Sequence, residues 1–279
     1  MRKPAAWPSE RAWHGLATGI LQHGVLRRPV GAVLRTGRRR RTARRARDND
    51  FAGSDRRRPP YLRGDIGYAA WLDEGDPFYR SFGGTGEVSF DNARFDKPPS
   101  ATIGLGYQFT DVIRADLTAE YFEGRFDGSS LSASPCAGEG AGTRCALSHS
   151  ANFSALGLMA NGYLDLATLA GFTPYLGAGI GATRIDWKTT HETSTCVGAG
   201  GACSGAAGGA SYGGRDSWRF TYALMAGVSY DVTDRLKFDA GYRYSQIADG
   251  DMFGSGGAKG HDDGLSRHEF RVGLRFALW

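Results

Sequence analysis

The chain of 279 residues contains 42 glycines, 12 tyrosines and 15 phenylalanines, and its formal net charge at pH 7 is +5. Glycine and aromatic enrichment without excess proline is typical of strand-rich folds, and it excludes a helical bundle, a collagen-like chain and a wholly disordered chain. No run of eighteen apolar residues occurs. This excludes a transmembrane helix of normal length but not a β-barrel, whose strands show only alternation of apolar and polar residues.

Residues 1–60 differ from the rest of the chain in composition, because eleven arginines lie between Arg35 and Arg58. These arginines carry the positive charge, and the remainder of the chain is close to neutral or acidic. The segment shows no lasting strand or helix periodicity, so we expect disorder. Its charge alone would suit nucleic acid or anionic lipid. It lacks interleaved aromatic residues, and we predict no nucleic-acid partner.

A regular alternation begins at Tyr61 and continues to the end of the chain, which predicts a barrel domain over 61–279. The predicted strands cover 61–72, 99–109, 112–126, 151–166, 173–188, 216–230, 235–247 and 265–279. Short turns alternate with long loops, and the long loops cover about 73–98, 127–150, 189–215 and 248–264. This pattern predicts an all-β fold, an eight-stranded antiparallel up-and-down transmembrane β-barrel with both of its ends on one side.

The cysteines fall as two close pairs inside predicted loops, Cys136 with Cys145 and Cys196 with Cys203. Neither pair has the spacing of a metal site. A disulfide within each loop would suit an oxidising periplasmic or surface setting. Four free thiols are the alternative, because spacing does not prove connectivity. No residue pattern indicates a metal or any other cofactor.

The strand predicted at 216–230 bears on whether the barrel lies in a membrane or in water. Its apolar stripe is aromatic at both ends and aliphatic in the middle, and it reads Trp218, Phe220, Tyr222, Leu224, Ala226, Val228 and Tyr230. Two aromatic girdles around a hydrocarbon band require this order. A soluble barrel with its apolar stripe turned inward is the alternative.

A lipid-facing apolar stripe places the charged stripe inside an eight-stranded barrel, which is just wide enough for side chains to fill. Buried charges persist only when they are paired. We therefore predict an interior salt-bridge network that seals the lumen. Its expected members are Arg114, Asp116, Glu120, Lys237, Asp239, Arg243, Glu269, Arg271 and Arg275.

Three histidine-containing groups are candidates for catalysis, and they are Ser148 with His149, His191 with Glu192, and His261 with Asp262 and Asp263. Adjacent strand residues point to opposite faces, so Ser148 and His149 are poorly placed as nucleophile and base. The glycine-rich stretches 177–181 and 198–214 lack the following helix that a phosphate loop needs. We expect no enzyme and no catalytic residue.

Several motifs resemble the small outer-membrane β-barrel proteins of proteobacteria, those with an OmpA-like barrel and the opacity-type surface antigens. The motifs are YLRGDIGY at Tyr61–Tyr68, IGLGYQF at Ile103–Phe109, TPYLGAGIGAT at Thr173–Thr183, AGYRYS at Ala240–Ser245 and EFRVGLRF at Glu269–Phe276. The resemblance covers about 61–279. It implies a bacterial outer-membrane location with the long loops facing the cell exterior.

The resemblance also implies partners and a function. Expected partners are outer-membrane lipid and lipopolysaccharide, the barrel-insertion machinery that reads a terminal aromatic such as Trp279 or Phe276, and an extracellular or host surface ligand. The expected function is structural or surface interaction through the loops. A small ion or solute channel is the alternative, and a lipid-modifying enzyme is less favoured. Family members carry a cleavable signal, and none is recognisable in residues 1–60, so a misassigned start also explains that segment.

Overall fold

A computed structural model describes residues 59–73, 77–80, 88–205, 208–255 and 258–278. The chain divides into one unit of residues 1–55 and a second unit of residues 56–279, and all described residues belong to the second. Residues 1–58, with the arginine block of the predicted N-terminal segment, and Trp279 lie outside the described residues. Within the described ranges, no helix has the length and apolar character needed to cross a membrane.

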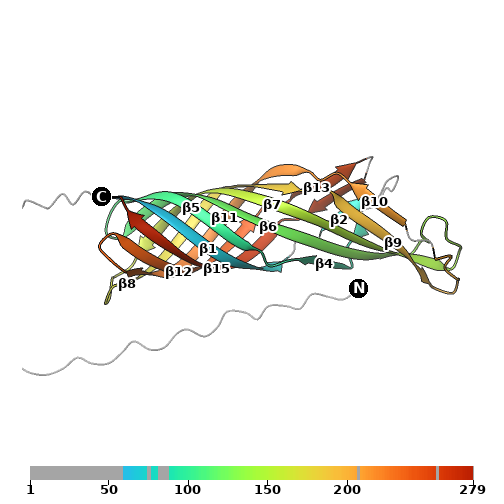
Figure 1. Cartoon of the computed structure of the whole chain (residues 1–279), viewed down its shortest axis with the longest axis horizontal. Coiled ribbons are helices and arrows are strands. Elements are labelled where there is room, and N and C mark those ends of the chain that lie inside the picture. The colour runs from blue at the N-terminus through green and yellow to red at the C-terminus, as the bar shows by residue number, and fades with distance from the viewer. Residues whose placement is uncertain (1–58, 74–76, 81–87, 206–207, 256–257, 279) are drawn as a thin grey trace, which may run out of the picture. The chain divides into compact units, whose positions relative to one another are not determined.

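Eight strands close into an antiparallel barrel, which confirms the predicted fold class. They are β1 (Pro60–Asp73), β5 (Pro99–Gln108), β6 (Ile113–Ser132), β7 (Thr143–Asp165), β8 (Phe172–Trp187), β11 (Asp216–Asp231), β12 (Leu236–Ile247) and β15 (Leu265–Ala277). Each strand pairs with its neighbours in chain order, and the pairing of β1 with β15 closes the ring. Figure 1 shows these strands running at a slant around the barrel.

The short turns lie at one end of the barrel, and two of them, between β5 and β6 and between β11 and β12, share a local signal. Thr110 accepts hydrogen bonds through Oγ1 from the backbone N–H groups of Val112 and Ile113, at 3.1 and 2.8 Å. Thr233 accepts from Arg235 and Leu236 in the same way, at 3.3 and 3.0 Å. A threonine hydroxyl that bonds the backbone two and three residues ahead favours a tight reversal. The sequence Thr-Asp therefore ends β5 and β11 where the alternation stops.

The long connections contain strands of their own, which the sequence did not predict. They are β2 (Phe78–Arg80), β3 (Val88–Ser89), β4 (Asn92–Phe95), β9 (Thr190–Gly198), β10 (Gly208–Tyr212), β13 (Gly250–Ser255) and β14 (Ala258–Asp262). Strand β4 pairs with β6, and β9 pairs with both β7 and β10, so the barrel wall continues past the ring. Strands β13, β14, β2 and β3 form a separate four-stranded sheet.

The loop predicted at 127–150 is mostly strand, which corrects that boundary. Strand β6 continues to Ser132 and β7 begins at Thr143, so the connection between them covers only 133–142. In Figure 1 these two strands extend well beyond β1 and β5. The sequences Gly-Ser-Ser at 128–130 and Ser-His-Ser at 148–150 weaken the apolar alternation there, although the backbone remains paired.

The outward face of the barrel carries an apolar band. Leu117, Leu224 and Phe270 are 67%, 55% and 73% exposed. Aromatic residues flank the aliphatic ones on β11, where Trp218 and Tyr230 are also exposed. An apolar band between aromatic girdles is what strands need to cross a bilayer. The structure therefore confirms the prediction that apolar residues face outward and charged residues face the lumen. It does not support a soluble barrel with its apolar stripe turned inward.

The pattern reverses near the long-loop end. On β6 the outward residues change from Leu117 and Tyr121 to Glu123 and Arg125, while the inward residues change from Glu120 to aromatic side chains. We call the part with apolar residues outside the stem. We call the part beyond it the head, and its inward side begins at Phe122, Ala155, Ile185, Ile247 and Leu265.

Candidate functional site

The end of the stem next to the head holds two carboxylates among three arginines. Glu120 on β6 accepts hydrogen bonds from Arg243 and Arg267, and its carboxylate lies 2.7 Å from the guanidinium of Arg271. Glu269 on β15 lies 2.7 Å from Arg267 and also contacts Arg271. Three strands, β6, β12 and β15, thus supply one compact cluster. Each carboxylate is shared, which offsets the cost of burying these charges.

A second cluster lies toward the short-turn end. Arg63 on β1 contacts Asp65 and Asp116, each at 2.8 Å, and donates to the hydroxyl of Tyr163 at 2.7 Å. The amide of Asn161 donates to Asp116 at 2.8 Å. Hydrogen bonds therefore satisfy both Asp116 oxygens, as a buried carboxylate requires.

Two further ion pairs lie near the mouth of the stem at the short-turn end. Arg114 contacts Asp165 at 2.9 Å, and its guanidinium lies 3.8 Å from the ring centre of Tyr163. Arg275 contacts Asp239 at 2.6 Å. The stacked ring and the carboxylate together surround the Arg114 guanidinium in a way that suits a weakly hydrated planar cation.

The structure places most of the charged residues singled out from the sequence in these clusters. Lys237 is different, because it lies at the short-turn rim, where its side chain is 39% exposed and contacts Asp231. Interior residues absent from the expected set are Arg63, Asp65, Asp165, Arg219 and Arg267. The motif YLRGDIGY carries a signal for two of them, since Arg63 and Asp65 alternate with lipid-facing Leu62 and Ile66.

The interior of the head is an aromatic core, which the sequence analysis did not identify. The rings of Phe153 and Trp187 are 4.7 Å apart, and Phe126 is fully buried. The Arg267 guanidinium lies 4.2 Å from the ring centre of Phe122, at the junction with the stem. The buried members of the core include Tyr79, Phe95, Phe122, Phe126, Phe153, Ile185, Trp187, Ile247, Met252, Phe253 and Leu265.

His149 is buried against this core, between the rings of Tyr79 and Phe90 at 4.9 and 5.1 Å. Its Nε2 lies 2.9 Å from Glu192 on the neighbouring strand, and Tyr212 donates to the same carboxylate at 3.1 Å. The hydrogen bond from His149 lowers the pKa of Glu192. Burial beside this carboxylate raises the pKa of Tyr212 to about 12. The trio holds β9 and β10 onto β7.

A buried ion pair joins the four-stranded sheet to the barrel wall. Arg219 on β11 contacts both carboxylate oxygens of Asp262 at 2.8 Å and donates to the backbone carbonyl of Asp251 at 3.0 Å. Burial raises the pKa of Asp262, and the neighbouring Arg219 opposes that rise. Because Asp262 belongs to β14, this contact fixes the sheet over the end of the barrel.

Two disulfides lie at the tips of the head, and they join Cys136 to Cys145 and Cys196 to Cys203. This confirms the within-loop pairing, and the described residues include no free cysteine. Cys145 lies directly opposite Cys196 in the β7–β9 ladder, so the two disulfide loops are neighbours.

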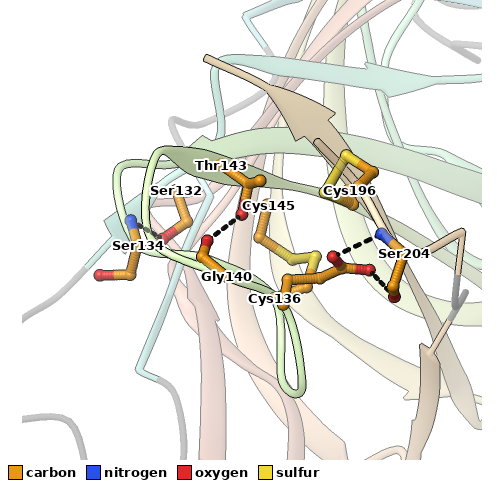
Figure 2. Close-up of a disulfide and its surroundings, with 10 residues drawn as sticks. Ser132, Ser134, Cys136, Gly140, Thr143, Cys145, Cys196 and Ser204 are labelled. Carbon is orange, nitrogen blue, oxygen red and sulfur yellow. Dashed lines mark hydrogen bonds between the residues drawn. A yellow bond between two sulfur atoms is a disulfide. The ribbon is translucent and has the colours of Figure 1, made fainter. Parts of the chain in front are cut away.

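The two disulfide loops also bind each other through side chains and backbone. Glu139 accepts hydrogen bonds from the backbone N–H and the hydroxyl of Ser204, at 2.8 and 2.6 Å (Figure 2). The carbonyl of Gly142 accepts from Ala199 and Gly201 at 3.0 and 2.8 Å. Loops that are separate in sequence therefore form one tip, in which each disulfide limits the freedom of its own loop.

The structure places Ser148 and His149, and likewise His191 and Glu192, on opposite faces of their strands. Ser148 is exposed on the outer face, whereas His149 is buried on the inner face. His191 lies on the outer face and contacts Ser211 at 3.2 Å. His261 contacts Asp249 and Asp251. No group of three or more metal-ligating side chains occurs among the described residues.

The chain is similar to several bacterial proteins. An uncharacterised protein of Brucella abortus is 35% identical over 77% of this chain and 84% of its own length. A candidate adhesin of Rickettsia bellii is 30% identical over 77% of this chain and 86% of its own length. The crystal structure of OprG from Pseudomonas aeruginosa aligns with a TM-score of 0.47 and 16% identity, over 79% of this chain and 96% of that one.

A family model provides the assignment that the fold and the apolar band suggest. The model describes an outer membrane protein beta-barrel domain, and it matches residues 50–276. This range includes the whole eight-stranded ring up to Phe276. The chain therefore belongs to the outer membrane protein beta-barrel family.

Proposed function

We propose that this protein is a structural, surface-exposed outer-membrane barrel that does not conduct and that acts through its head. The observation that carries this proposal is the filling of the interior at two levels. Paired charges, including those of Glu120 and Glu269, occupy the stem, and an aromatic core containing Phe126 and Phe153 occupies the head. A sealed barrel leaves its outer surface for function, and exposed loops on a rigid scaffold commonly carry binding.

The head is built as a rigid display. Its long connections form paired strands, its tips are closed by two disulfides, and its sheet is held by Arg219 and Asp262. Ordered loops lose little conformational entropy when they bind, which favours a recognition role. The relative from Rickettsia bellii named as a candidate adhesin supports a surface-interaction role for this chain as well.

Conductance of the purified protein in planar bilayers tests the sealed interior. We expect background conductance from the wild type. A comparison variant replaces Glu120, Arg243 and Arg267 together with Phe126 and Phe153 by alanine. Because it removes side chains from both filled levels, it should raise the frequency of open events. Steady open events in the wild type would contradict the proposal.

A channel is the second candidate function, because a cavity of about 580 Å³ opens at the short-turn end. Its lining includes Asp165 and Arg275, which also belong to the interior ion pairs. Conduction would require these pairs to separate. If the lumen is sealed, the cavity ends at these ion pairs. The same bilayer recording distinguishes a conducting channel from a closed cavity.

The direction of the head is tested on intact cells. We propose that it faces the cell exterior and that the protein has no catalytic activity. An epitope inserted between Gly138 and Gly140 should bind antibody without permeabilising the cells. If the antibody bound only after the cells were permeabilised, the head would face the periplasm. A change in lipid A or phospholipid that disappears in His149→Ala or His191→Ala would instead establish a lipid-modifying enzyme.

A further inference from the structure

The outward face of the head contains an ordered set of polar side chains. Five strands, β4, β6, β7, β9 and β10, lie side by side there. Cross-strand pairing aligns two rows on this face. The distal row is Asn92, Ser129, Ser148, Thr193 and Gly209, and the proximal row is Arg94, Asp127, Ser150, His191 and Ser211.

The two rows share a polar character. All their side chains are polar, and each side chain is exposed or half-buried. Serine and threonine hydroxyls both donate and accept, and asparagine presents a donor and an acceptor in one plane. A groove of about 600 Å³ lies over the rows and is lined by side chains from both, among them Asn92, Ser148 and Thr193. Neighbouring strands place these groups about 4.8 Å apart.

One cation on this face, Arg94, makes no direct ion pair in the described part of the chain. Asp127 lies directly opposite Arg94 in the ladder, but Asp127 contacts Arg125, with 3.0 Å between Nε and Oδ2. Arg94 is exposed and has no ion-pair partner among the described residues. Because the Arg94 guanidinium at the edge of the groove is not held in an ion pair, it can bind a carboxylate or sulfate group on a ligand.

The face is also rigid. Directly behind the rows, Phe126 and His149 are buried in the core of the head, and the trio with Glu192 holds β9 in place. Polar groups fixed by the packing behind them lose little entropy on binding. Protein interfaces, in contrast, depend on aromatic and other large anchors in a desolvated centre. Neither row contains an aromatic or aliphatic side chain apart from the imidazole of His191.

We propose that this face binds an oligosaccharide, with the hydroxyl and amide groups of the two rows contacting sugar hydroxyls and Arg94 contacting an acidic substituent. The inference rests on the proposed surface-interaction role. A polyhydroxylated ligand matches groups that donate and accept at regular spacing, and it does not require an apolar anchor. The Arg94 guanidinium makes acidic sugars better ligands than neutral ones.

The test uses the full-length protein folded in detergent and an array of neutral and acidic oligosaccharides. The wild type should bind acidic members with measurable affinity. Arg94→Ala should lower the ratio of acidic to neutral binding about tenfold, as expected for loss of one charged hydrogen bond. The triple variant Asn92→Ala, Ser148→Ala, Thr193→Ala should lose about a hundredfold or more. The matched control is Arg184→Ala with Asp216→Ala, an exposed ion pair on β8 and β11, which should leave binding unchanged.

Heat-dependent gel migration checks that every variant still folds, so loss of binding is not confused with loss of structure. The inference would be overturned if no oligosaccharide bound at millimolar concentration, or if the row variants did not alter the binding. Variants that lose binding to a protein while the array stays negative would also overturn it. Because the array uses purified protein, its result is independent of the antibody test for the direction of the head.

Discussion

The stem and the head place opposite chemistries on the same strands. Along β6, Leu117 faces outward and Glu120 inward in the stem, whereas Arg125 faces outward and Phe126 inward in the head. The strand does not change its phase between them, because inward and outward positions alternate without a break. Only the surroundings change, from lipid to water. Apolar side chains follow the apolar environment, which is outside the stem and inside the head.

Ion pairs differ between the two parts for the same reason. Arg267 and Glu269 in the stem have side chains that are 2% and 1% exposed, whereas Arg125 and Asp127 on the head are 55% and 56% exposed. Removing one member of a buried pair leaves an unpaired charge in a low dielectric. An exposed pair loses only a water-screened attraction. The comparison therefore predicts unequal responses to similar substitutions.

The largest effect should come from Glu120→Ala. Removal of this carboxylate leaves Arg243, Arg267 and Arg271 sharing only Glu269, and we expect the free energy of unfolding to fall by about 3–5 kcal/mol. Urea titration in detergent micelles measures it. Asp127→Ala is the matched change on the head and should have little effect. Equal losses in the two variants would remove the distinction between interior and exterior charges.

A comparable loss is expected from Phe126→Ala, confined to the head. Phe126 is fully buried, and cutting back a buried phenylalanine costs about 3–5 kcal/mol. Limited proteolysis should show earlier cleavage in the β6–β7 hairpin while the stem keeps its heat-dependent gel migration. If the variant lost both the protease resistance of the hairpin and the heat-dependent gel migration of the stem, stem and head would unfold as one unit.

Leu117→Arg should destabilise the stem by about 2–4 kcal/mol, because it places a charge against the bilayer hydrocarbon. Glu123→Arg is the matched control, since position 123 lies on the same face of β6 but in the head. Refolding into lipid vesicles followed by urea titration measures both. Equal tolerance of the two arginines would contradict the placement of the lipid boundary between Tyr121 and Glu123.

The smallest effect concerns pH. The hydrogen bond with His149 lowers the pKa of Glu192 in the folded head. A carboxylate with a lowered folded pKa contributes stability that is present above its unfolded pKa and is lost as pH falls through the folded value. The protection factors of the β9 amides, which correct for the slower intrinsic exchange in acid, should therefore fall on acidification below about pH 4.5. Glu192→Gln should flatten this dependence, and an unchanged profile would exclude Glu192 as its source.

The sequence predicted the ring better than the head, and the reason is local. Strong alternation at Phe238, Asp239 and Ala240 or at Leu117 and Thr118 reports both the strand and its two sides. In the head the signal is weak, because Gly-Ser-Ser at 128–130 and Ser-His-Ser at 148–150 fit either a loop or a polar strand face. For this reason the sequence analysis missed the ends of β6 and β7 within 127–150 and the short strands within the other long connections.

By itself, the sequence determined the eight strands, their sides and the grouping of the cysteines, because these depend on residues close together in the chain. Tertiary structure alone decided which charges meet. Glu120 and Arg267 are far apart in sequence, and Lys237 shares the inward phase of its strand yet lies at the rim with Asp231. The aromatic core of the head was decided in the same way. The alternation along a strand determines whether a residue faces the lumen or the lipid. Which side chains it meets there depends on its position along the barrel axis, and that position follows from the register of all eight strands.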